Sequence, residues 1–119
     1  MRAIGVDMIE IERIAGLIAR KGDRFLRRVY TAQELAHCAG RAPSLAARWA
    51  AKEAVGKAFG TGIGDVAFRE IEVVCDERGR PAIALHGEAA RLARRLGWRH
   101  IALSLSHTRR YAVAMVVVE

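Results

Sequence analysis

The residues best suited to chemistry lie in one segment, "RWAAKEAVGKAFGTGIG" (residues 48–64), which reads as a helix followed by a glycine-rich turn. Glu53 and Lys57 are four positions apart and therefore share one helix face. Trp49 lies one turn earlier on that face, and two glycines continue the stripe, although glycine inside a helix costs roughly 1 kcal/mol against alanine. The stripe fits either a solvated face, whose ion pair contributes about 0.3–0.5 kcal/mol, or a site that another group approaches closely.

Three other segments carry polar groups that could join such a site. Asp7 ends the apolar part of a predicted strand, where a carboxylate serves either as a helix N-cap or as a ligand. The turn "GTGIG" (residues 60–64) could hold a phosphate on backbone N–H groups, but its spacing is neither a P-loop nor a dinucleotide fingerprint. "SLSH" (residues 104–107) could bind phosphate oxygens, and no G-x-S-x-G nucleophile elbow is present. Each segment alone also has an ordinary structural explanation.

The chain is strongly basic, with a net charge of +7. Such a charge attracts an acidic partner: nucleic acid, an anionic membrane, an acidic protein or a phosphorylated small molecule. The arginines gather within residues 13–28 and 91–99, which fit two solvated faces or docking of that partner. A small nucleic-acid-binding domain stays open as an alternative, although only seven residues are aromatic. A metal-dependent nuclease is a second alternative, and the acid-x-lysine order of the common nuclease motif is absent.

Length and composition predict one domain, residues 1–119, with its own core. The longest apolar run, Tyr111 to Val118, is far too short to cross a membrane. The N-terminal stretch alternates and carries acids, unlike a signal peptide, so we expect a cytoplasmic protein. Cys38 and Cys75 form no CxxC pair and are expected to be free thiols, and no zinc site is indicated.

Hydrophobic period and turn residues predict the elements that must position these side chains. Strands are predicted at residues 2–9, 68–76, 82–86, 100–107 and 111–118. Helices are predicted at residues 10–20, after the capping box at 31–34, from a Ser44 cap to about Gly60, and at 87–97. The segment 23–30 is expected to be a short basic turn with Asp23 as its N-cap. The order β-α-α-α-β-β-α-β-β predicts a single α+β domain with a largely antiparallel sheet packed against helices.

Three separated pieces of the chain occur in a telling order: "IGVDMIEIERI" (4–14), "RWAAKEAVGKAFGTGIG" (48–64) and "LSLSHTRRYAVAMV" (103–116). In a chain of this length they resemble the short bacterial 4′-phosphopantetheinyl transferases, the holo-acyl-carrier-protein synthase family. The G-x-D near the N-terminus and the W/F-x-x-K-E-x-x-x-K helix are together highly specific. The resemblance spans nearly the whole chain.

This resemblance implies the 4′-phosphopantetheinyl transferase fold and a Mg²⁺-dependent reaction of fatty acid biosynthesis and lipid metabolism. The phosphopantetheine arm of coenzyme A moves to a serine hydroxyl of apo-acyl carrier protein, and adenosine 3′,5′-bisphosphate leaves. The family is typically a homotrimer with coenzyme A bound between neighbouring subunits. Since coenzyme A and the carrier protein are the implied partners, we expect no nucleic-acid partner and no membrane association. The apolar strand at 111–118 would then be buried either in the trimer or in the core of one subunit.

The resemblance also assigns residues. Asp7 and Glu53 would be the Mg²⁺ ligands, since Mg²⁺ prefers oxygen, and together with Lys57 they would be catalytic. A metal and a lysine can stabilise the charge that develops on the pyrophosphate, and Glu53 is a candidate to accept the serine proton. Contacts to coenzyme A are implied for Arg48, Lys52, Lys57, Gly60, Thr61, Gly62 and His107. Trp49 is assigned to packing.

Docking of the carrier protein is expected on the N-terminal arginines. Acyl carrier proteins are acidic, so Arg13, Arg24 and Arg28 would attract one by complementary potential. Such binding should weaken as salt rises.

Overall fold

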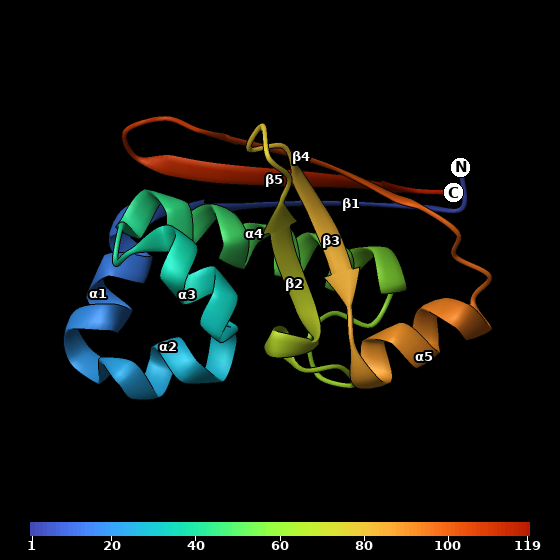
Figure 1. The fold of residues 1–119 in the computed structure, drawn as a ribbon, viewed down its shortest axis with the longest axis horizontal. Helices are drawn as coiled ribbons and strands as arrows, with labels where there is room; N and C mark the ends of the chain where they lie inside the picture. Colours follow the sequence, from blue (N-terminus) through green and yellow to red (C-terminus); the bar gives the residue numbers. More distant parts are fainter.

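A computed structural model describes residues 1–119 of the chain. Its elements follow the predicted order with two additions: a helix at Asp23–Val29, between the first two predicted helices, and a short 3₁₀ helix at Phe68–Glu70 (Figure 1). The elements are β1 (Ala3–Glu10), α1 (Ile11–Lys21), α2 (Asp23–Val29), α3 (Ala32–Cys38), α4 (Ala42–Phe59), η1 (Phe68–Glu70), β2 (Ile71–Cys75), β3 (Pro81–Leu85), α5 (Gly87–Arg95), β4 (Ile101–His107) and β5 (Tyr111–Val118). The α+β prediction is confirmed.

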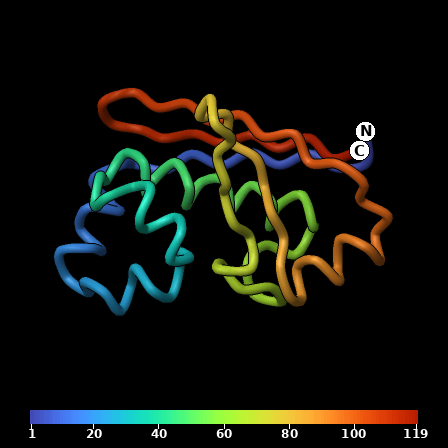
Figure 2. Tube along the Cα trace, in the orientation of Figure 1, coloured from blue at the N-terminus to red at the C-terminus, as the bar shows by residue number.

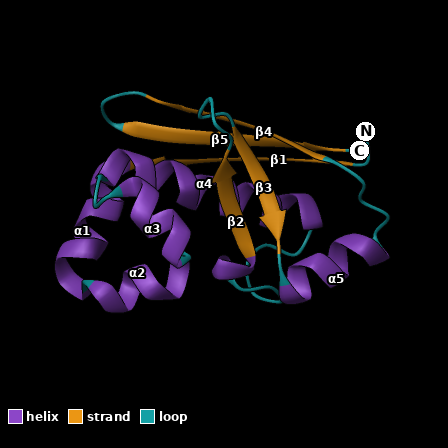
Figure 3. Ribbon diagram, in the orientation of Figure 1, coloured by secondary structure: helices purple, strands orange, loops and turns teal.

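The strands form two antiparallel sheets, shown in orange in Figure 3. The first sheet has the order β1-β5-β4, and the second is the hairpin β2-β3. The predicted antiparallel pairing is therefore confirmed, but the division into two sheets was not predicted. β3 runs beside β4 without a backbone ladder between them. No helix combines the length and apolar composition that a membrane crossing needs.

The long helix α4 packs directly on β1 and β5 and forms the centre of the core. Gly5 makes this close packing possible, because a Cβ there would lie 1.9 Å from the carbonyl oxygen of Ala54. The helix meets the strand with small residues, since Ala50 and Ala54 are fully buried. The glycine of the G-x-D motif therefore has a structural role. It lets α4 pack closely on β1, so that the aspartate of the motif lies beside that helix.

The three-stranded sheet buries one face and exposes the other. On the inner face, Ala112, Ala114 and Val116 of β5 are fully buried under α4. The outer face is nonetheless apolar, with exposed fractions of 38–65% for the large side chains Ile4, Val6, Met8, Tyr111 and Met115. The single chain thus buries only one of the two faces of the apolar C-terminal strand.

Several helix ends differ from the predictions. The capping box of Thr31 and Glu34 is confirmed, and Gly97 takes the expected positive φ of 77° after α5. The Ser44 cap is wrong, because α4 begins at Ala42 with Pro43 in its first turn and no side-chain cap. Proline in a first helical turn has its φ preset and loses no hydrogen bond there. The segment after Gly22 is also not a turn but the helix α2, and Asp23 is its first residue rather than its N-cap.

Candidate active site

Asp7 and Lys57 meet where β1 crosses α4. Asp7 lies on the inner face of β1, with a side chain 16% exposed, and Lys57 donates a hydrogen bond from Nζ to its Oδ1 at 3.0 Å. Glu53, one helical turn before Lys57, is half-buried. The structure therefore brings together the three residues predicted to be catalytic.

The Glu53 carboxylate is electrostatically strained. Burial is the main effect that raises the pKa of Glu53 above its usual value, and the negative charge of Asp7 raises it further. Lys57 and Arg13 act in the opposite direction. Two carboxylates that repel each other in this way form a place where a cation would be stabilised.

The donor set of this pair fits Mg²⁺ better than a transition metal. No group of three or more His, Cys, Asp or Glu side chains able to hold a metal occurs in the chain. A pair of carboxylates alone leaves most of an octahedral shell to water and substrate oxygens, which is the usual way that Mg²⁺ is bound. Asp7 and Glu53 would hold such an ion.

The glycine turn is held against the same helix. The N–H of Gly62 donates to the carbonyl oxygen of Gly56 at 2.9 Å, and a Cβ on Gly56 would lie 3.0 Å from the Gly62 carbonyl carbon. The group that approaches the small helix residue is thus the chain's own turn. Gly60 is the helix C-cap with φ 87°, and the exposed Thr61 follows it. Gly60, Thr61 and Gly62 therefore lie just beyond Lys57.

Lys52 does not face this site, and the structure contradicts its predicted contact with coenzyme A. Its side chain has 0% exposure, and Nζ donates to Glu34 Oε1 at 2.8 Å, Phe68 O at 3.1 Å and Ile71 O at 2.5 Å. Burial lowers the pKa of Lys52, and the Glu34 carboxylate opposes that shift. Every donor of the ammonium is used inside the protein, so none is left for a ligand.

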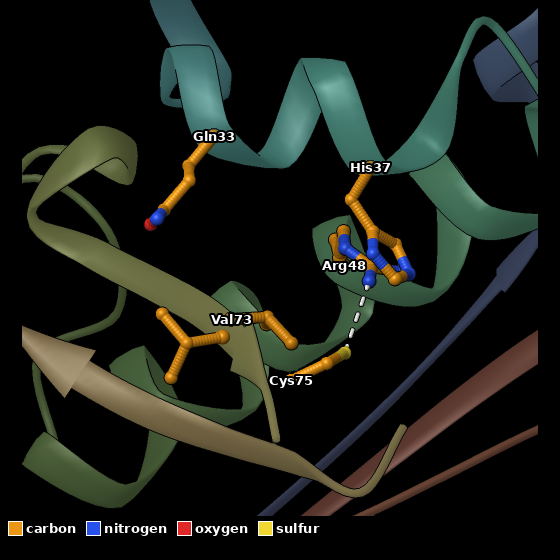
Figure 4. A pocket seen from close by; sticks show the side chains of 6 residues that line it. Gln33, His37, Arg48, Val73 and Cys75 are labelled. Carbon is orange, nitrogen blue, oxygen red and sulfur yellow. Dashed lines mark hydrogen bonds between the residues drawn. The ribbon is translucent and has the colours of Figure 1, made fainter. Parts of the chain in front are cut away.

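Arg48 is also buried, at 5% exposure, but it borders a cavity of about 210 Å³. Figure 4 shows its guanidinium between His37 of α3 and Cys75 of β2. Nη2 lies 3.6 Å from Cys75 Sγ, and Nε has no hydrogen-bond partner. A buried donor without an acceptor is costly, so this cavity suits an anionic or polar group.

His107 lies far from the glycine turn within one chain. It is exposed at the end of β4 and aligns across β5 with Ile9, whereas Gly5 packs between Ala54 and Ala58. The turn follows Ala58, so the two predicted coenzyme A contacts are separated by about six strand residues, or ~20 Å. In Figure 2 the β4–β5 loop lies at one end of the molecule, and α4 ends well away from it, in the half that holds α5 and the chain termini. The single chain does not bring these residues together.

A larger cavity of about 620 Å³ lies between α1, α2, α4 and η1. Glu53 does not line it, but it neighbours the cavity, because Trp49 one helical turn earlier lines it and Arg13, another lining residue, acts on the pKa of Glu53. The three predicted docking arginines all line it, together with Arg20 of the same basic segment. Sequence reasoning missed Lys21 and an apolar floor, which consists of Leu17, Phe25, Val29, Trp49 and Phe68. The Trp49 ring stacks on the Phe68 ring at 4.6 Å, which confirms its assignment to packing.

A buried polar cluster between α3, α4 and β2 was also missed. Glu72 accepts a hydrogen bond from Thr31 Oγ1 at 2.6 Å and lies 2.9 Å from His86 Nε2. Although burial raises it, these hydrogen bonds leave the pKa of Glu72 below its usual value. The other acid of this cluster is Glu34, and its place in the predicted capping box was the one sequence signal for the cluster. A capping-box glutamate that faces the core can accept hydrogen bonds from a second residue besides the helix N-terminus.

Comparison with known proteins agrees with this geometry. Residues 3–116 match the family model described as the 4′-phosphopantetheinyl transferase superfamily. The holo-[acyl-carrier-protein] synthase of Herpetosiphon aurantiacus is 50% identical, over 98% of each chain. The crystal structure of the Neisseria meningitidis synthase has a TM-score of 0.91 at 35% identity, covering 100% of this chain and 98% of that one. The Helicobacter pylori synthase, solved with coenzyme A, has a TM-score of 0.90 at 32% identity, covering 98% and 99%. The chain belongs to the 4′-phosphopantetheinyl transferase superfamily and, within it, to the holo-[acyl-carrier-protein] synthases.

Proposed function

We propose that this enzyme transfers the 4′-phosphopantetheine arm of coenzyme A to a serine hydroxyl of apo-acyl carrier protein, with Mg²⁺, in fatty acid biosynthesis. Adenosine 3′,5′-bisphosphate is the second product. The observation that carries the proposal is the strained carboxylate pair Asp7 and Glu53 beside Lys57, at the edge of a basic cavity. A solved relative that binds coenzyme A supports the choice of donor.

The residues of the site have separate roles in this proposal. Bound Mg²⁺ would supply charge stabilisation at the pyrophosphate, held by Asp7 and Glu53. Lys57, half exposed and now paired with Asp7, is free to turn its ammonium toward phosphate oxygens. Glu53 would also accept the proton of the attacking serine, directly or through a water molecule.

Coenzyme A contacts are proposed for the groups that remain accessible. Lys57, Gly60, Thr61 and Gly62 would hold phosphate oxygens next to the carboxylate pair. Arg48 would meet another anionic part of the ligand from its cavity. His107 completes the set only if it comes from a second subunit, since it lies ~20 Å away in the same one.

A homotrimer would supply that second subunit. The exposed apolar outer face of β1 and β5 is the surface that such an assembly would bury. Light scattering tests this step, and substitution of Val6 by arginine should convert the trimer to monomers without transferase activity. A monomeric wild-type enzyme with full activity would contradict it.

The carrier protein would dock on the basic cavity that Arg13, Arg24 and Arg28 line. Its apolar floor suits a helix that presents one apolar side chain among acids. Docking there would bring the carrier's serine toward Glu53, one helical turn from Trp49 of that floor.

One assay tests the main proposal against the nucleic-acid alternative. The enzyme is incubated with coenzyme A, Mg²⁺ and apo-acyl carrier protein, and the carrier is weighed by mass spectrometry. A mass gain equal to the phosphopantetheine arm is expected, and chelation should stop it. Tight RNA binding by a folded sample that leaves the carrier unmodified would instead favour the basic nucleic-acid-binding domain.

A further inference from the structure

The Lys52 ammonium has a complete set of partners inside the protein. Its three acceptors are one carboxylate oxygen and two backbone carbonyl oxygens, at 2.5–3.1 Å. A neutral amine has only two N–H donors, so three acceptors require the charged form. The same Glu34 carboxylate also accepts the backbone N–H groups of Thr31 and Val73, each at 2.9 Å. The pair therefore fastens α4 to α3, to η1 and to β2.

The burial of apolar side chains does not by itself orient α4 about its own axis. Eleven of its 18 residues are buried, so the helix has no single apolar face that would orient it. Five of those eleven buried residues are alanines, including Ala46, Ala50 and Ala54. Small side chains form shallow ridges, which interlock less deeply with a neighbouring element than large side chains do. The hydrogen bonds of Lys52 are directional, so they add a constraint on the rotation of α4 that burial alone does not supply.

Rotation of α4 matters because Glu53 is the next residue. Successive helix residues point about 100° apart, so an anchor at Lys52 fixes the direction in which Glu53 points. Side chains extend about 5–6 Å from a helix axis, so a roll of ~20° would move the Glu53 carboxylate by about 2 Å. A misplacement of about 1 Å can cost ~100-fold in rate.

We propose that Lys52 and Glu34 are positioning residues, which lock the rotation of α4 and so hold Glu53 at its working distance from Asp7. The inference rests on the proposed function for its effect on transfer. Its structural part is independent, because it concerns the cation affinity of the carboxylate pair.

The double substitution Lys52→Met with Glu34→Gln tests this. Both side chains are replaced by neutral ones of similar length, so no lone charge is left in the core. We expect a folded protein by circular dichroism, a kcat at least tenfold lower and a half-saturating Mg²⁺ concentration at least tenfold higher. The KM for carrier protein should change less than kcat does, because the five cations of the basic cavity lie on α1 and α2 and are unchanged. Mn²⁺ binding without substrates, measured by electron paramagnetic resonance, should weaken to the same degree as Mg²⁺ saturation.

A matched control separates positioning from stability. Val118, fully buried at the end of β5, can be changed to alanine to lower the melting temperature by a similar amount. This control should keep the wild-type Mg²⁺ requirement and Mn²⁺ affinity. Glu34→Gln alone keeps the length of the side chain and both carbonyl acceptors of Lys52, so it provides a milder variant if the double one does not fold. We expect a smaller shift of the same sign.

The proposal is overturned if either variant is folded and matches the wild type in kcat and in cation affinity. It is also overturned if Val118→Ala shifts these quantities equally. A wild-type enzyme that binds Mn²⁺ but modifies no carrier protein would refute the proposed function instead, and the Mn²⁺ comparison would still decide the positioning claim.

Discussion

The two sides of α4 that carry the neighbouring residues Lys52 and Glu53 are opposites in electrostatic terms. Lys52 is fully buried, and each of its donors has an acceptor within the chain. Glu53 is only half-buried, is repelled by Asp7 and has a raised pKa. One side is a finished structural unit, and the other is complete only when a cation and a substrate are present.

The difference shows how the role of a charged residue can be recognised. Both residues belong to one motif, and both are charged groups on the same helix. What separates them is the number of partners that the fold provides. A charged side chain whose hydrogen-bond and ion partners all lie within the protein contributes to the structure. A charged side chain with a shifted pKa and no such complete set of partners indicates a functional site.

The largest effect should come from removing either carboxylate on the Glu53 side. Asp7→Asn and Glu53→Gln should each reduce transfer by at least about 100-fold, because each removes a ligand or the serine's proton acceptor. Both variants should remain folded, since neither residue holds the core. Single-turnover rates and circular dichroism measure the two quantities. A variant with a near-normal rate would remove that residue from the proposed metal site.

A substitution on the Lys52 side of α4 should lower the free energy of unfolding. Lys52→Met alone leaves the Glu34 carboxylate buried without its ion partner, which typically costs about 3–5 kcal/mol. The adjacent substitution Glu53→Gln should leave the free energy of unfolding nearly unchanged. Urea unfolding of the two variants makes the comparison directly. Equal losses of stability would mean that the two sides of α4 do not differ as described.

The sequence predicted one side of this comparison much better than the other. Asp7, Glu53 and Lys57 were predicted because a specific motif names them, and Gly5 explains why the motif brings them together. Lys52 was misassigned because a lysine in a motif was taken to meet the ligand, and only the packing of α3 and β2 shows that it is buried. Predictions of helix ends were also of both kinds. The Thr31 capping box was correct, whereas the Ser44 cap was wrong because the helix begins earlier, with Pro43 in its first turn.

The distance between His107 and the glycine turn was beyond any local pattern. Residues close together in a family's site can come from two subunits, and one sequence does not state which. The apolar floor of the basic cavity was missed for a related reason. Leu17, Trp49 and Phe68 come from three elements, and none has a pattern that differs from ordinary core packing.

A moderate effect is expected from the basic cavity beside Glu53. Arg24→Glu should raise the KM for carrier protein about tenfold and leave the KM for coenzyme A within twofold. Arg24 is a cleaner choice than Arg13, since Arg13 also acts on the Glu53 pKa. Arg94→Glu on α5 is the matched control, with the same change of charge outside the cavity. The difference between the variants should shrink as salt rises, and equal effects of both would argue against docking at this cavity.

The smallest effect tests the strain at Glu53 itself. The folded protein raises the pKa of Glu53, so the proton is bound more tightly in the folded than in the unfolded state. Its contribution to stability is therefore fully present below the unfolded pKa, about 4.3, and is lost as pH rises through the folded value. Above that value the ionised group opposes folding, so Glu53→Gln should raise the melting temperature of the metal-free protein. Because the side chain is partly solvated, we expect a gain of only about 1–2 °C at pH 8 and none at pH 4.

Millimolar Mg²⁺ should stabilise the wild type more than the variant, since the ion relieves the same repulsion. A variant that gains as much at pH 4 as at pH 8 would show that the gain comes from packing, and that the Glu53 side is as well satisfied as the Lys52 side.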